Sequence, residues 1–231
     1  MVAQRLRAAT RASPLARWQT DHVASLLAPH GVTVEPVPLT TTADRRLDVP
    51  LWAMGGKGAF VAEVRAAVLD GRADLAVHSA KDLPAVAAEG LALAAVPARA
   101  DPRDVLVGAR LDDLALGATV ATGSARRRVQ LAWRRPDLTF AGLRGNIATR
   151  LAKVPVGGAV VVAAAALERL GVNLGSRPVE VLDPAIMLPQ VGQGALAVEC
   201  RADDEELRTL LARVEHDPSR LAVDAERAFL A

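Results

Sequence analysis

The sequence predicts an α/β protein made of two doubly wound domains with largely parallel sheets. Short apolar segments alternate along the chain with segments of helical periodicity, which is the pattern of βα units. The alternation is interrupted at residues 99–104 and then resumes, which divides the chain into two stretches. A chain of 231 residues is long enough for two domains of roughly 100 residues each.

The first stretch has clear start and stop signals. Ser13 followed by Pro14 is typical of a helix start, and Gly71 is typical of a helix end. Residues 40–57 are polar, lack periodicity and end in a glycine-rich segment that contains Lys57, which predicts a mobile loop. We expect strands at residues 5–10, 32–37 and 75–78, and helices at residues 14–26 and 60–69.

The second stretch repeats this order, and the chain then returns to the first domain. We expect strands at 118–122, 138–141, 159–162 and 195–199, helices at 125–134, 146–153, 163–171, 205–214 and 219–230, and a loop at 188–194. Domain 1 is therefore expected to comprise residues 1–98 and 195–215, and domain 2 residues 99–194. Residues 216–231 are expected to form a helix that lies beyond both domains and leads toward a further one. Two crossings between domains predict a hinge and a cleft.

Composition argues against several function classes. The net charge of +2, with three Phe, three Trp and no Tyr, argues against a nucleic-acid partner, although an arginine-based binder stays open. No apolar run approaches a membrane span, and the N-terminus lacks a secretory signal, so we expect a cytoplasmic protein. The single cysteine, Cys200, ends a buried strand and is expected to be inert; no Cys/His spacing predicts a metal site.

Donor side chains follow the predicted strands, where open α/β sheets bind their ligands. Each group precedes a helix whose free N–H groups also favour anions. Arginine supplies all but three of the 28 basic residues, and its planar fork suits carboxylates and phosphates. The sequence therefore predicts a cleft for a strongly anionic small molecule. The donors are Arg11, Ser13, Ser79, Lys81, Ser124, Arg126, Arg127, Arg144 and Asn146.

Some of these residues also have a purely structural interpretation. Three consecutive arginines, Arg126 to Arg128, fan over about 200° of a helix surface, so at least one faces solvent. Ser13 can be a helix cap without any role in ligand binding, and His78 can be a hydrogen-bonded core residue. Asp82 would repel an anion, so it either stabilises a positive charge that develops on the substrate or pairs with a nearby arginine.

Seven segments resemble, in the same order, the motifs of the porphobilinogen deaminase (hydroxymethylbilane synthase) family. They are ATRASPLARWQ, GGKGAFVAEV, ADLAVHSAKDLP, DPRDVLVG, ATGSARRRVQLAWRRPDL, LRGNIATRL and LPQVGQGALAVECR. The resemblance covers nearly the whole chain, and HSAKDLP, LRGN and VGQGA are its most specific parts. It implies two periplasmic-binding-protein-like domains and a monomeric, cytoplasmic transferase of tetrapyrrole (heme, chlorophyll, cobalamin) biosynthesis. Such enzymes join four porphobilinogen units, with release of ammonia, into a linear oligopyrrole.

The resemblance also implies roles for individual residues. Asp82 would be the catalytic carboxylate, and Lys57 would lie in an active-site loop. Carboxylate binders would be Arg11, Ser13, Lys81, Arg126, Arg127, Arg144 and Arg150, and further cleft residues would be Ser79, Ser124, Asn146 and Gln193.

The family holds a dipyrromethane cofactor through a cysteine in a third, small α/β domain that follows the last helix. This chain stops before that point, and Cys200 does not lie at the attachment position. We therefore expect this chain to lack the third domain, to turn over slowly or not at all by itself, and to expose apolar surface near its end. The alternative function is a two-domain module that binds an anion without chemistry.

Overall fold

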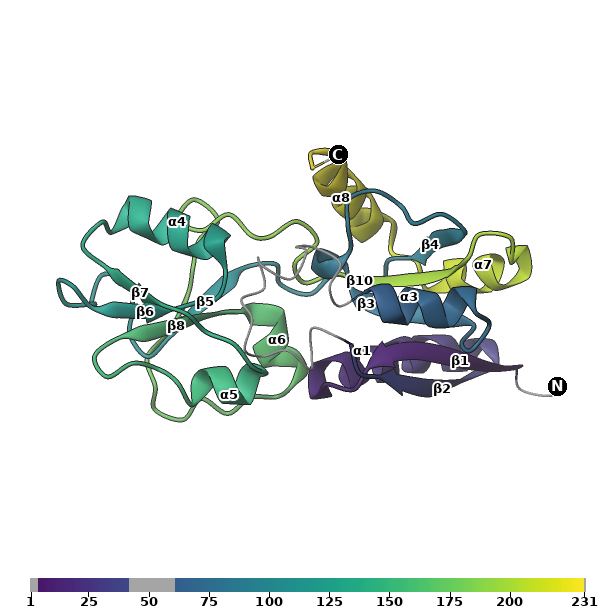
Figure 1. The fold of residues 1–231 in the computed structure, drawn as a ribbon, viewed down its shortest axis with the longest axis horizontal. Helices are drawn as coiled ribbons and strands as arrows, with labels where there is room; N and C mark the ends of the chain where they lie inside the picture. The colour runs from purple at the N-terminus through teal and green to yellow at the C-terminus, as the bar shows by residue number, and fades with distance from the viewer. Residues whose placement is uncertain (1–3, 42–60, 231) are drawn as a thin grey trace. The chain divides into compact units, whose positions relative to one another are not determined.

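The computed structural model describes residues 4–41 and 61–230 and consists of two compact units (Figure 1). Unit 1 comprises Met1–Ala100 and Ala195–Ala231, and unit 2 comprises Asp101–Gly194. Residues 216–230, expected to extend beyond both domains, belong to unit 1, where Val223 is buried in its core. The expected loop at 40–57, with Lys57, lies outside the described residues apart from its first two positions.

Unit 1 contains a five-stranded sheet in the order β2–β1–β3–β10–β4. Strands β1, β2 and β3 are parallel, whereas β10 runs antiparallel to both β3 and β4. The strands are β1 (Gln4–Arg11), β2 (Val32–Leu39), β3 (Leu75–Ser79), β4 (Leu91–Ala95) and β10 (Leu196–Arg201).

Helices cover both faces of this sheet because alternate residues of a strand point to opposite faces. Leu75 and Val77 pack in the cluster that contains residues of α1 (Pro14–Leu27) and α7 (Glu205–Leu211). Ala76 packs on the other face with α3 (Ala62–Leu69). That face also carries α8 (Asp217–Ala228), whose Val223 packs in one cluster with Ala197 of β10 and with Ala195 just before this strand. Short 3₁₀ helices are η1 (Ala28–His30), η3 (Ala80–Asp82) and η4 (Ala212–Val214).

Unit 2 contains a second five-stranded sheet in the order β7–β6–β8–β5–β9. Strands β6, β7 and β8 are parallel, and β5 is antiparallel to its neighbours β8 and β9. Figure 1 shows α4 on one side of this sheet and α5 and α6 on the other. The elements are β5 (Asp104–Val107), β6 (Thr119–Ala121), α4 (Ala125–Arg134), β7 (Thr139–Ala141), α5 (Ile147–Leu151), β8 (Ala159–Ala163), α6 (Ala164–Arg169) and β9 (Val179–Val181).

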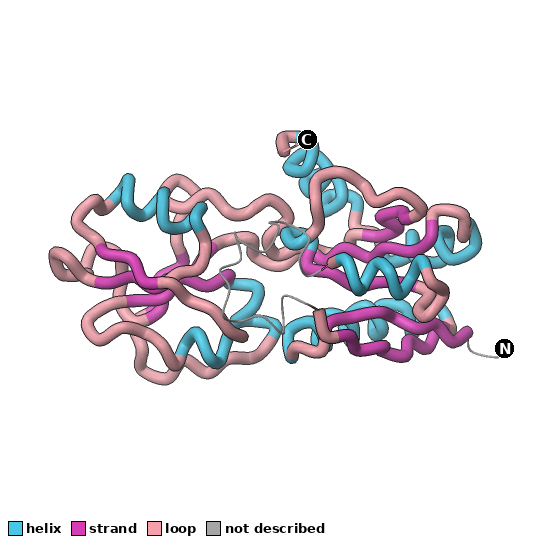
Figure 2. Tube along the Cα trace, in the orientation of Figure 1, coloured by secondary structure: helices cyan, strands magenta, loops and turns pink. Residues whose placement is uncertain are grey.

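The α/β class predicted from the sequence is confirmed, and strands form the centre of each unit (Figure 2). The expectation of largely parallel sheets is wrong in part, because β5, β9 and β10 bring antiparallel pairs. Sequence periodicity also missed β4, β5 and β9. Segment β4 is rich in alanine, β9 has only three residues, and β5 begins at the charged Asp104 in a segment interpreted as a crossing.

Candidate active site

The strand register of unit 1 brings its predicted donors to one edge of the sheet. Parallel pairing aligns Ala8 of β1 with Leu75 of β3, so Arg11 and Ser79 end neighbouring strands at nearly the same level. Ser13 follows β1, and η3 with Lys81 and Asp82 follows β3. This edge is called the unit 1 edge below: Arg11, Ser13, Ser79, Lys81 and Asp82.

Two polar side chains fix the backbone at the unit 1 edge. The Ser13 hydroxyl caps α1 by accepting a hydrogen bond from the Ala16 N–H at 3.3 Å, as predicted for a cap. The Gln19 amide donates to the Ser79 hydroxyl at 2.8 Å and ties α1 to the end of β3. Gln19 is buried, and sequence reasoning missed it. Its signal was its position between Ala16 and Val23, on the apolar face of the helix.

Asp82 lies in η3 beside Lys81, and both side chains are partly exposed. Within residues 4–41 and 61–230, no side chain donates a hydrogen bond to the Asp82 carboxylate, and none forms an ion pair with it. The structural interpretation of Asp82, a pair with a neighbouring arginine, is therefore not realised in this part of the chain.

Unit 2 gathers the remaining donors at the corresponding edge of its own sheet. Strands β6, β7 and β8 are parallel, so the loops after β6 and β7 emerge on the same side. Antiparallel pairing places Asp104, the first residue of β5, opposite Ala163, the last residue of β8. Asp104 therefore lies at this edge too. The unit 2 edge comprises Asp104, Ser124, Arg126, Arg127, Arg144, Asn146 and Arg150.

Asp104 is the centre of a buried polar cluster that sequence reasoning missed. Its carboxylate accepts hydrogen bonds from Arg126 Nη2 at 2.6 Å and from Arg127 Nη2 at 2.7 Å. Gln193 Nε2 donates to the same carboxylate at 2.9 Å. Burial alone would raise the pKa of Asp104, but the charges of Arg127 and Arg126 and these hydrogen bonds outweigh it and lower the pKa. Asp104 is therefore ionised at neutral pH.

The three consecutive arginines of α4 have three different environments. Arg127 is buried, Arg126 is partly exposed, and Arg128 is exposed and lies with its guanidinium 5.8 Å from the ring centre of Phe140. The prediction that at least one of them faces solvent is confirmed. Burial lowers the pKa of Arg127 despite the opposing charge of Asp104.

Helix caps shape the two loops that carry the other donors of unit 2. The Ser124 hydroxyl accepts from the Arg127 N–H at 3.4 Å, and the Asn146 side chain accepts from the Thr149 N–H at 2.9 Å. Arg150 Nε donates to the Gly145 carbonyl at 2.8 Å, which folds its side chain back onto the Arg144 loop. The loops also touch each other, since a Cβ at Gly123 would lie 2.5 Å from the Leu143 carbonyl oxygen. Only glycine fits there.

His78 belongs to a buried cluster behind the unit 1 edge rather than to the edge itself. Glu199 of β10 accepts two hydrogen bonds from Arg65 of α3, at 2.6 and 2.8 Å, and lies 3.2 Å from His78 Nε2. Burial favours a protonated Glu199, but His78 and Arg65 outweigh it and lower the pKa of Glu199 to about 2. The interpretation of His78 as a core residue is confirmed, but its expected hydrogen bond is not, because Nε2 lies near Glu199 without forming a hydrogen bond among the described residues.

Cys200 is fully buried on β10, and burial raises the pKa of its thiol to about 11. With this pKa, only about one thousandth of the Cys200 thiol is ionised at pH 8, so we expect no alkylation by iodoacetamide in the folded protein. Full modification after addition of guanidinium chloride is the positive control. Rapid modification without denaturant, followed by mass spectrometry, would contradict this account of an inert cysteine.

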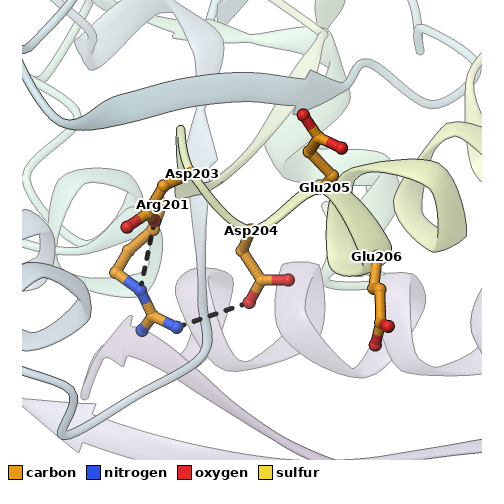
Figure 3. Close-up of a pocket in the computed structure, with 5 residues that line it drawn as sticks. All are labelled: Arg201, Asp203, Asp204, Glu205 and Glu206. Atoms are coloured by element: carbon orange, nitrogen blue, oxygen red, sulfur yellow. Dashed lines mark hydrogen bonds and ion pairs between the residues drawn. The ribbon is translucent and has the colours of Figure 1, made fainter.

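A surface pocket outside these edges has the wrong charge for an anion. Figure 3 shows Arg201, at the end of β10, with Asp203 and Asp204 beside it, while Glu205 and Glu206 at the start of α7 lie apart from it on the same pocket. Arg201 forms ion pairs of 3.4 and 3.7 Å with Asp204 and Asp203. The described part of the chain contains no group of His, Cys, Asp and Glu side chains suited to a metal ion. This pocket is therefore not the candidate site.

A family model described as "porphobilinogen deaminase, dipyromethane cofactor binding domain" matches residues 6–209. This match covers all of unit 2, most of unit 1 and every residue of both edges. The chain belongs to the porphobilinogen deaminase family.

Curated members of the family agree with this assignment. A porphobilinogen deaminase of Nitratidesulfovibrio vulgaris is 50% identical over 99% of this chain and 74% of its own length. A porphobilinogen deaminase of Acidothermus cellulolyticus is 51% identical over 98% of this chain and 70% of its own length. The similarity therefore extends through all the segments quoted above.

Solved structures with much lower identity share only the fold. The methionine binding protein MetQ aligns with 97% of this chain and 95% of its own, with a TM-score of 0.55 and 11% identity. The BvgS VFT2 domain of Bordetella pertussis aligns with 96% of this chain and 92% of its own, with a TM-score of 0.52 and 19% identity. These similarities agree with the predicted periplasmic-binding-protein-like fold of the porphobilinogen deaminase family.

The family's dipyrromethane group carries several carboxylates, and the donor chemistry of both edges fits such a group. Arg11, Lys81 and Arg144 are side chains of the kind that bind carboxylates. Cys200, the single cysteine of the sequence, is buried and does not fit the role of a covalent attachment point. No helix among the described residues is both long and apolar enough to span a membrane.

Proposed function

We propose that this chain is a transferase of tetrapyrrole biosynthesis that joins porphobilinogen units head to tail with release of ammonia. Membership in the porphobilinogen deaminase family is the observation that carries the proposal. The proposal includes porphobilinogen and linear oligopyrroles as ligands, dipyrromethane as cofactor, and a monomer working in the cytoplasm.

The proposed chemistry starts at the aminomethyl group of porphobilinogen. Its C–N bond breaks, ammonia leaves, and a methylene-pyrrolenine cation remains. The α-carbon of another pyrrole attacks the methylene carbon of this cation, a C–C bond forms, and the attacking α-carbon then loses its proton. When bound, the dipyrromethane supplies the first pyrrole acceptor. Asp82 would stabilise the cation, because a preorganised carboxylate favours the positive charge that develops when ammonia departs.

The proposed binding residues are the donors of the two edges. Each porphobilinogen brings an acetate and a propionate, and guanidinium groups bind carboxylates through short, charge-assisted hydrogen bonds. We assign carboxylate binding to Arg11, Ser13, Lys81, Arg126, Arg144 and Arg150, with Ser79, Ser124 and Asn146 shaping the backbone around them. Arg127 and Gln193 would act through Asp104. Lys57 is proposed as a residue of an active-site loop, and it lies outside the residues that the structure describes.

Conversion of porphobilinogen by the purified protein tests the function. The expected result is release of one ammonia for each pyrrole joined, together with a linear tetrapyrrole found by mass spectrometry. A protein that binds porphobilinogen but forms neither product over long incubation, even when free dipyrromethane is added as the first pyrrole acceptor, would support the alternative, a non-catalytic anion-binding module.

A further inference from the structure

Asp104 lies at the unit 2 edge, but its contacts do not suit a residue that binds a ligand directly. Its side chain is fully buried, yet it contacts two arginines that belong to the predicted binding set. The side chain of Arg126 is 20% exposed and that of Arg127 is 8% exposed. Asp104 is therefore unable to meet a ligand directly and can influence one only through a neighbour.

Arg127 is held entirely inside unit 2. Its Nε and Nη2 donate to one oxygen of Asp104 at 3.1 and 2.7 Å, and its Nη1 donates to the Val161 carbonyl at 2.9 Å. All three nitrogens of the guanidinium are thus bound to protein acceptors on two adjacent strands. This arginine fixes Asp104 to the sheet.

Arg126 is held through both of its terminal nitrogens, whereas its buried Nε has no hydrogen-bond partner among the described residues. Its Nη2 donates to the other oxygen of Asp104 at 2.6 Å, and its Nη1 donates to the Leu188 carbonyl. One-fifth of the side chain stays exposed. Asp104 and Leu188 therefore set the direction in which the exposed part of this guanidinium points.

Gln193 completes the support of the carboxylate from a distant part of the chain. Its Nε2 donates to Asp104 at 2.9 Å and to the Pro102 carbonyl at 2.7 Å, and its side chain is buried. The group contains two guanidinium charges and one carboxylate charge, so it keeps a net positive charge that attracts an anion. A rigid carboxylate with a surplus of positive charge around it suits a positioning role.

We propose that Asp104 is a positioning residue for ligand binding: it orients Arg126 so that this arginine binds a pyrrole carboxylate. The proposal rests on the proposed function and deepens it, since it separates the two adjacent arginines into one that contacts the ligand and one that holds Asp104.

A double-mutant cycle tests this proposal, with the dissociation constant of porphobilinogen measured by isothermal titration calorimetry. Asp104→Asn and Arg126→Gln should each raise it about tenfold, the usual effect of losing one charge-assisted hydrogen bond. The double variant should bind no more weakly than Arg126→Gln alone, because Asp104 acts through Arg126. A merely structural role of Asp104 would give additive effects.

Asp137→Asn is the matched control, because Asp137 also binds an arginine near α4, Arg135, at two distances of 2.8 Å. Asp137 lies just before β7 begins, at the opposite end of that strand from the donors, so its substitution should leave porphobilinogen binding unchanged.

If circular dichroism shows that the Asp104→Asn protein is unfolded, Gln193→Met replaces this substitution in the cycle. This change removes a donor to Asp104 but keeps all charges, and we expect about a threefold effect that vanishes in the Arg126→Gln background.

Three outcomes overturn the proposal: tighter binding by Asp104→Asn, an unchanged dissociation constant, or additive effects with Arg126→Gln. Failure of the proposed function gives a different result, in which the wild-type protein binds porphobilinogen but forms no product. Absence of any binding by the wild-type protein overturns both proposals.

Discussion

Asp82→Asn should lower the rate of ammonia release from porphobilinogen at least about 100-fold, whatever the absolute rate of the wild-type chain. The substitution keeps the size of the side chain but removes the charge that would stabilise the developing cation, and such preorganised groups commonly contribute factors of this size. The affinity for porphobilinogen should stay the same or increase, because a negative charge is removed beside an anionic ligand. Release of ammonia and calorimetric binding are measured on the same preparation.

Glu89→Gln is the control for this prediction, since Glu89 is exposed in the turn before β4. Its rate should equal that of the wild type. If the Asp82→Asn protein releases ammonia at the wild-type rate, this carboxylate has no catalytic role. A loss of binding equal to the loss of rate would instead assign Asp82 a part in holding the ligand.

Glu199→Gln should lower the free energy of unfolding by about 3–5 kcal/mol at pH 7, because it breaks a buried ion pair and leaves Arg65 uncompensated. A carboxylate whose pKa falls from 4.5 to about 2 on folding contributes about 3 kcal/mol at neutral pH, which agrees with this range. Arg65 of α3, His78 of β3 and Arg227 of α8 provide the surrounding charges and polar atoms. Urea unfolding followed by circular dichroism measures the effect.

The same change has a defined pH dependence. The folded-state pKa of Glu199 is lowered, so its contribution is complete above pH 4.5 and is lost as the pH falls towards 2. The difference in stability between wild type and Glu199→Gln should therefore shrink over that window. Asp70→Asn, which removes an exposed partner of Arg72, should change stability by less than about 0.5 kcal/mol. A Glu199→Gln protein as stable as this control would contradict the account.

The edges of the two sheets could be predicted because they depend on local signals. A strand, a polar turn and a helix start follow one another in the sequence, and parallel strands necessarily deliver such turns to the same edge. Arg11, Ser13, Ser124 and Asn146 were found in this way, and three of them also serve as the helix caps that their residue types favour.

The partners inside the units could not be predicted because they depend on antiparallel pairing between distant segments. Asp104 reaches the unit 2 edge only because β5 runs antiparallel to β8. Glu199 lies beside His78 only because β10 inserts between β3 and β4. Neither register has a signal in the sequence of one strand. Gln19 is similar, since its helical position indicated burial but not the serine of another element that it would bind.

The central claim is that the arginines of the two edges bind pyrrole carboxylates. The most direct test is to measure how arginine variants bind porphobilinogen. Arg11→Gln and Arg144→Gln should each raise the calorimetric dissociation constant about tenfold or more. Arg72→Gln before β3 and Arg110→Gln after β5 lie at the opposite ends of their sheets and should leave it unchanged. Equal effects of all four substitutions, or none from the first two, would contradict the claim.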